Sequence, residues 1–173
     1  RLRIATLLLL AVAVAAGTAN AASRQVGAAL ESLQEVPAIS STGHGAFAGT
    51  FSLDGEELEF ELSYADLEGE VAQAHLHLGQ VAVNGGISIF LCSNLGNGPA
   101  GTPECPDSPG MVSGTLSAAD VIGPEGQGID PGEWEEIVQA IRQGAVYANV
   151  HTDLFPGGEI RGQLRTDQRR QRP

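Results

Sequence analysis

From residue 25 onward, apolar and polar side chains alternate along this chain. In the segment 57–64 every second side chain is apolar, namely Leu58, Phe60, Leu62 and Tyr64. This period of two is typical of a strand with one face in a core and one in water. The acidic residues between them, Glu57, Glu59 and Glu61, are interpreted as that solvated face rather than as a calcium site.

Similar strands are expected at about 25–32, 44–53, 71–79, 86–92, 110–117, 145–152 and 158–164. Turn-forming pairs separate them, and the chain contains 23 Gly and 9 Pro. Length predicts one domain, because 173 residues leave no room for a second of ordinary size. The predicted fold is therefore all-β, an antiparallel Greek-key-like β-sandwich or barrel of about eight strands.

One segment breaks the alternation and predicts a short helix at about 131–143. Asp130 stands at the expected N-cap and Gly144 just past the end. Four apolar residues follow helical spacing: Trp134, Ile137, Val138 and Ile141. This stripe should close one end or edge of the sandwich, and Trp134 should pack there rather than stack on a ligand.

The first 21 residues read as a secretory signal peptide. Two arginines precede an apolar run at 4–16, and Ala-Asn-Ala follows at 19–21. The alternative is a membrane anchor, but the run is shorter than the ~20 residues that a span requires. We expect a secreted, periplasmic or extracellular protein with no transmembrane span after cleavage. Its β domain would occupy residues 22–164, followed by a disordered polar tail at 165–173.

Export determines how the two cysteines are interpreted. Cys92 and Cys105 are separated by a stretch rich in Gly, Pro and Asn, so an oxidising compartment should join them as a disulfide. Two free thiols acting as metal ligands are the alternative, but the spacing fits no CxxC pattern.

The net charge and the absence of common catalytic motifs argue against several classes of function. The formal net charge is −12 and all nine basic residues are arginine, which argues against nucleic acid as a partner. Nucleophile-elbow, P-loop, dinucleotide-binding and His-Glu-x-x-His motifs are absent from the sequence. A catalytic role is therefore not favoured.

Three of the four histidines fall in a suggestive pattern. His75 and His77 share the outer face of one predicted strand, about 6.5–7 Å apart along the backbone, and His151 lies on the outer face of another. If those strands are neighbours, three imidazoles could bind copper or zinc, with an open fourth position. The alternative is three polar residues on a wet face. His44 could be a fourth ligand, but an ordinary turn residue is favoured.

Glu159 and Arg161 are expected on the polar side of the last strand. There they would form a surface salt bridge or bond a turn.

Four segments resemble the motifs of the CHRD domain, the module repeated in the secreted protein chordin and found alone in secreted microbial proteins. They are Gln-Glu-Val-Pro at 34–37, Ala-His-Leu-His-Leu-Gly at 74–79, the run 144–152 and the run 155–164. The resemblance spans residues 25–164 and implies secretion and a β fold. In chordin the module belongs to an extracellular antagonist that binds growth factors, whereas the microbial single-domain members have no settled activity. An extracellular or envelope protein is therefore a possible partner for a module of this kind.

The histidine pattern is also similar to the copper half of copper,zinc superoxide dismutase. By that resemblance His75, His77 and His151 would be copper ligands. That family also needs a bridging histidine and a zinc-binding aspartate, neither of which can be identified here.

Three functions follow as hypotheses: a non-catalytic CHRD-type binding or structural module, a copper- or zinc-binding protein, and a redox enzyme that uses copper. Gly-rich strands with little charge, such as 45–51, could also pair edge to edge into a homo-oligomer.

Overall fold

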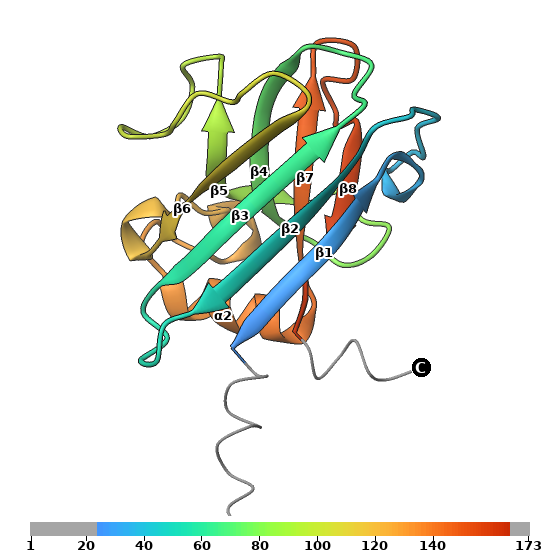
Figure 1. Ribbon diagram of the computed structural model, residues 1–173. Helices are drawn as coiled ribbons and strands as arrows, with labels where there is room; N and C mark the ends of the chain where they lie inside the picture. Colours follow the sequence, from blue (N-terminus) through green and yellow to red (C-terminus); the bar gives the residue numbers. More distant parts are fainter. Residues whose placement is uncertain (1–23, 167–173) are drawn as a thin grey trace, which may run out of the picture.

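The computed structural model describes residues 24–166 as a β-barrel with one α-helix (Figure 1). Its strands are β1 (Gln25–Glu31), β2 (His44–Phe51), β3 (Leu58–Ala65), β4 (Val71–Leu78), β5 (Gly86–Ser93), β6 (Gly110–Leu116), β7 (Val146–Thr152), β8 (Ile160–Gln163) and β9 (Arg165–Thr166). The helix is α2 (Trp134–Gln143), and three single 3-10 turns are η1 (Ser32–Gln34), η2 (Ala118–Asp120) and η3 (Glu125–Gln127). The predicted signal peptide and residues 167–173 lie outside the described residues.

The strands form one antiparallel sheet in the order β5-β4-β7-β8-β1-β2-β3-β6, with β9 also paired to β1. The sheet curls until its edge strands β5 and β6 come into contact, so the barrel is nearly closed. Because β4 pairs with β7 rather than β3, the chain crosses between the two halves as a Greek key does. The predicted fold class is confirmed.

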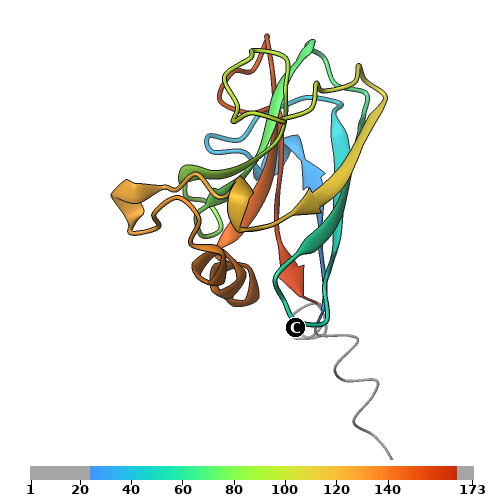
Figure 2. The same cartoon turned by 90° about the vertical axis from the view of Figure 1, so that its left-hand side faces the viewer.

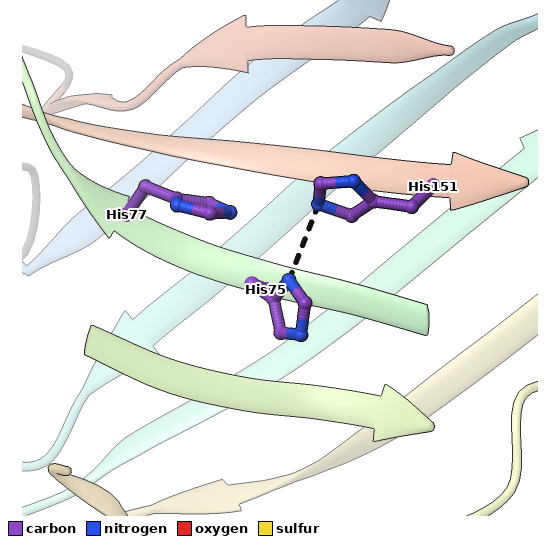
Figure 3. Close-up of side chains that lie close together, drawn as sticks. All are labelled: His75, His77 and His151. Atoms are coloured by element: carbon purple, nitrogen blue, oxygen red, sulfur yellow. Dashed lines mark hydrogen bonds between the residues drawn. The ribbon is translucent and has the colours of Figure 1, made fainter. Parts of the chain in front are cut away.

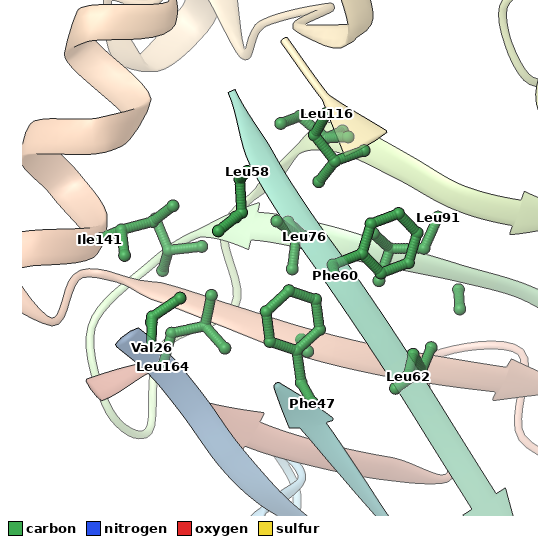
Figure 4. Packing of buried hydrophobic residues seen from close by; sticks show 14 of the residues in the cluster. Val26, Phe47, Leu58, Phe60, Leu62, Leu76, Leu91, Leu116, Ile141 and Leu164 are labelled. Carbon is green, nitrogen blue, oxygen red and sulfur yellow. The ribbon is translucent and has the colours of Figure 1, made fainter. Parts of the chain in front are cut away.

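Alternation places one apolar set inside the barrel. Figure 4 shows this core, in which the rings of Phe47 and Phe60 stack with centroids 5.9 Å apart. The apolar stripe of α2 belongs to the same cluster, and the helix lies across the lower end of the barrel (Figures 1 and 2). Trp134 packs as predicted, and its indole N–H donates to the carbonyl oxygen of Gly55.

The helix begins later than predicted, at Trp134, with Glu133 rather than Asp130 at the N-cap. The reason is Gly132, whose φ of +88° lies outside the helical region. The Glu133 carboxylate instead accepts a bond from the backbone N–H of Asp130. Gly144 ends the helix in the left-handed conformation, as predicted.

The structure also tests the predictions made for the two cysteines and for the C-terminal tail. The disulfide between Cys92 and Cys105 is formed, as predicted. Arg165 and Thr166, assigned to a disordered tail from the sequence, instead form β9 against β1. None of the helices among residues 24–166 is long and apolar enough to cross a membrane.

Candidate metal centre

The structure brings His75, His77 and His151 together. Strands β4 and β7 are neighbours, with His75 opposite Asn149 and His77 opposite Tyr147. One ring nitrogen from each histidine lies within 4.8 Å of the other two. Figure 3 shows the three rings converging from the two strands. We call this group the histidine cluster.

The predicted wet environment of these histidines is wrong. They do lie on the face opposite the core, as the alternation required, but their exposed fractions are only 0% for His75 and 6% each for His77 and His151. Loops cover them, because the Nδ1 of His77 contacts the carbonyl oxygen of Gly85 and the Nδ1 of His151 contacts that of Pro156. Strand periodicity identifies a face but cannot show that loops fold over it.

These loop contacts fix which nitrogens are free. A carbonyl oxygen only accepts, so Nδ1 of His77 and of His151 each donate a proton, and both Nε2 atoms keep their lone pairs. The Nε2 of His77 is buried and has no hydrogen-bond partner. The Nε2 of His151 faces the Nδ1 of His75 at 3.2 Å. Loop carbonyls that orient ligand imidazoles in this way are typical of metal sites.

The spacing of the nitrogens suits one small ion. Two nitrogens bound at 2.0–2.1 Å to a metal with trigonal or tetrahedral angles lie about 3.3–3.6 Å apart. The observed separation between His75 Nδ1 and His151 Nε2 is 3.2 Å. One ring nitrogen of His77 lies within 4.8 Å of a ring nitrogen on each of the other two histidines, so His77 must move closer for all three to bind the same ion.

Burial keeps the histidine cluster neutral. Desolvation, with repulsion from the other two histidines, lowers the pKa of His75 to about 2. Desolvation and repulsion from His151 lower the pKa of His77 to about 4, and burial also lowers the pKa of His151. At neutral pH the three imidazoles are therefore uncharged, which is the state that binds metals.

The ring of His77 also stacks against Tyr147, which in turn contacts Arg161. The His77 ring lies parallel to that of Tyr147, with centroids 4.8 Å apart. The Cζ atom of Arg161 lies 3.5 Å from the centroid of the same tyrosine ring, a cation–π contact. The tyrosine hydroxyl also accepts the N–H of Gly85, the residue whose carbonyl binds His77.

Arg161 holds the loop that covers the cluster. Its guanidinium donates to the carbonyl oxygens of Gln80 and Val83 and to the side-chain oxygen of Asn84. The predicted surface pair of Glu159 and Arg161 is thus wrong, since both are buried and they have separate partners. The alternative that each bonds a turn is confirmed. Five donors on one planar group explain why arginine stands here.

Glu159 is the equivalent anchor for the neighbouring loops. Its carboxylate accepts from the backbone N–H groups of Glu68 and Gly69 and from the hydroxyls of Ser41 and Thr152. Four donors on one buried carboxylate join three segments that are distant in sequence.

Sequence reasoning gave no role to Glu35, Tyr147 or Asn149. Asn149 lies opposite His75 and donates to the Oε1 of Glu35 at 2.6 Å. Burial raises the pKa of Glu35 to about 7, against the lowering effects of Asn149 and Arg161. Tyr147 and Asn149 share the outer face of β7 with His151, which is the signal that could have found them.

His44 stands apart from the cluster. It begins β2 rather than occupying a turn, its side chain is 60% exposed, and its Nδ1 lies 3.8 Å from Asp66. The interpretation of His44 as a fourth ligand has no support among the described residues.

Comparison with known protein families identifies one that covers most of the chain. The model of the CHRD domain matches residues 26–164. No match was found among curated proteins or among solved structures. The four motifs noted in the sequence supply residues that are all buried: the histidine cluster, Glu35, Tyr147, Asn149, Glu159 and Arg161.

Proposed function

Because the chain belongs to the CHRD domain family, we propose that it is a non-catalytic extracellular module in which His75, His77 and His151 hold one copper or zinc ion. Extracellular placement is supported by the family and by the disulfide, which forms in oxidising compartments. The partner of such a module would be an extracellular or envelope protein.

One observation carries the metal proposal: the buried Nε2 of His77 has no hydrogen-bond partner and is directed into the histidine cluster. A buried polar atom without a partner costs about 1–3 kcal/mol. Backbone carbonyls fix the tautomers of His77 and His151 so that both lone pairs face inward. A bound ion would occupy the inward lone pairs of His77 and His151 together, and neutral imidazole suits copper and zinc.

The same burial favours storage or stabilisation over turnover. A redox enzyme needs an open coordination position that its substrate can reach. The three ligands here are at most 6% exposed and lie under two loops. This weighs against the alternative of a copper redox enzyme.

The test is metal content. The protein, exported to an oxidising compartment, is dialysed against copper or zinc and then analysed for both elements. We expect about one equivalent per chain, lost in H77Q and in H151Q and kept in H44Q, which removes an exposed histidine outside the cluster. Circular dichroism confirms that each variant is folded. Absence of metal in the wild-type protein, or equal metal in H77Q and H44Q, contradicts the proposal.

A further inference from the structure

We propose that the histidine cluster is a three-coordinate site that selects monovalent copper over zinc and divalent copper. This inference rests on the metal site proposed above and specifies which ion it takes. It is carried by the ligand set, the burial of that set and the charges around it.

The ligand set consists of three neutral nitrogens and nothing else. Within residues 24–166, no carboxylate or thiolate joins the three imidazoles in the cluster. Both cysteines are in the disulfide, and the buried Glu35 binds Asn149 instead of a histidine. Zinc in proteins is almost always four-coordinate, so here it would need a water as its fourth ligand, whereas monovalent copper can be bound by two or three nitrogens alone.

Burial penalises a divalent ion more than a monovalent one. The cost of moving an ion out of water scales with the square of its charge, so two charges cost about four times as much as one. No anionic ligand offsets that cost here, and the ligand nitrogens are nearly inaccessible to solvent. The desolvation cost at this buried cluster is therefore lowest for an ion with a single charge.

The positive charge of Arg161 acts in the same direction. The Arg161 guanidinium lies over the face of Tyr147 opposite to His77. The repulsion of a bound ion by Arg161 is proportional to the ion's charge, so it doubles for a divalent ion.

The decisive experiment titrates the metal-free protein with each ion separately. Monovalent copper is supplied without oxygen as its bicinchoninate complex, whose loss of colour reports transfer to the protein. Zinc and divalent copper are supplied from buffered solutions. We expect one equivalent of monovalent copper, bound about 100-fold or more tightly than zinc or divalent copper. An X-ray absorption edge typical of three-coordinate monovalent copper should accompany it.

The controls separate this inference from the proposed function. In wild-type protein, imidazole 1H–15N signals of His75, His77 and His151 should shift with copper while that of His44 does not; this measurement needs no variant. The H75L/H151L variant should lose the copper, and H44Q should keep it. Zinc or divalent copper bound as tightly overturns the selectivity but leaves the proposed function standing. No ion bound, or copper retained by the folded double variant, overturns both.

Discussion

The Nδ1 atom of His75 lies 3.2 Å from the Nε2 atom of His151, and the proton between them belongs to His75. His151 already donates its Nδ1 proton to the carbonyl oxygen of Pro156, and burial keeps its ring neutral. Its Nε2 can therefore only accept. In the metal-free protein His75 must carry its proton on Nδ1, the nitrogen that would bind the ion.

Metal binding should therefore move a proton within His75 without releasing one. We expect long-range 1H–15N spectra to show all three rings as Nδ1–H tautomers in the metal-free protein. On binding, His75 alone should become the Nε2–H tautomer, because its Nδ1 lone pair is then on the ion. An Nε2–H tautomer of His75 before metal is added contradicts this prediction.

The metal-free protein should lose stability in acid earlier than an ordinary β-barrel. The pKa values of His75 and His77 are about 2 and about 4 in the folded protein, against 6.5 in the unfolded chain. From pH 6.5 down to about pH 4 the unfolded chain binds protons that the folded protein does not. The free energy of unfolding should fall with pH, by up to about 1.4 kcal/mol per pH unit for each histidine.

Glu35 acts in the opposite direction and supplies the control. Its pKa is raised from 4.5 to about 7, so between these values the folded protein holds a proton that the unfolded chain releases. Stability from Glu35 is present in acid and is lost as the pH rises toward 7. Guanidinium unfolding at pH 7, 6 and 5 should therefore show a steeper loss in E35Q than in the wild type. A flat or shallower profile in E35Q is the contrary result.

Two adjacent glycines make a matched pair of variants. A Cβ on Gly158, whose φ is +123°, would lie 2.5 Å from the Asn149 Nδ2 and 2.6 Å from the Glu35 Oε1, whereas one on Gly157 would meet nothing within 4 Å. We expect G158A to destabilise the protein by about 2–4 kcal/mol through strain and overlap. G157A should change the stability by less than about 0.5 kcal/mol. Thermal and denaturant unfolding measure both, and similar values for the two would refute the packing described here.

Replacing Arg161 should destabilise the protein and loosen the loop at residues 79–85. In R161M three acceptors lose a charged donor, two of them the backbone carbonyls of Gln80 and Val83, so we expect a loss of about 2–4 kcal/mol. Amide hydrogen exchange should accelerate at residues 79–85. The control is R142M, whose guanidinium lies over Phe51 on the exposed side of α2 with its Cζ atom 5.7 Å from the ring centroid. Equal exchange at residues 79–85 in the two variants would contradict the role of Arg161.

Most of the strands could be predicted because the alternation of apolar and polar side chains determines which face of a strand enters the core. The alternation of Leu58, Phe60 and Leu62 identifies the inner face of β3 directly. The start of α2 was placed too early because the positive φ of Gly132 depends on the turn before the helix. The faces of His75, His77 and His151 could be predicted, but their burial could not.

Burial of those three side chains depends on loops that return from distant parts of the chain. Arg161 reaches a loop about 80 residues earlier, and Glu159 reaches Ser41, 118 residues away. Contacts between residues so far apart in the sequence produce no repeating pattern of apolar and polar residues from which they could be predicted. Gly43 illustrates the point, because a Cβ there would lie 2.8 Å from the side chain of Leu67 and 3.0 Å from that of Glu159, a crowding visible only in the folded chain.

His75 and His151 are separated by 76 positions along the chain, so their meeting on β4 and β7 also fixes an order of events. An unfolded chain offers only the pair on β4, and the complete cluster exists after the late strand β7 has docked beside β4. Loading therefore follows folding. An ion at the proposed site would therefore be drawn from the metals available in the compartment in which the chain finishes folding, and not from those of the compartment in which it was synthesised.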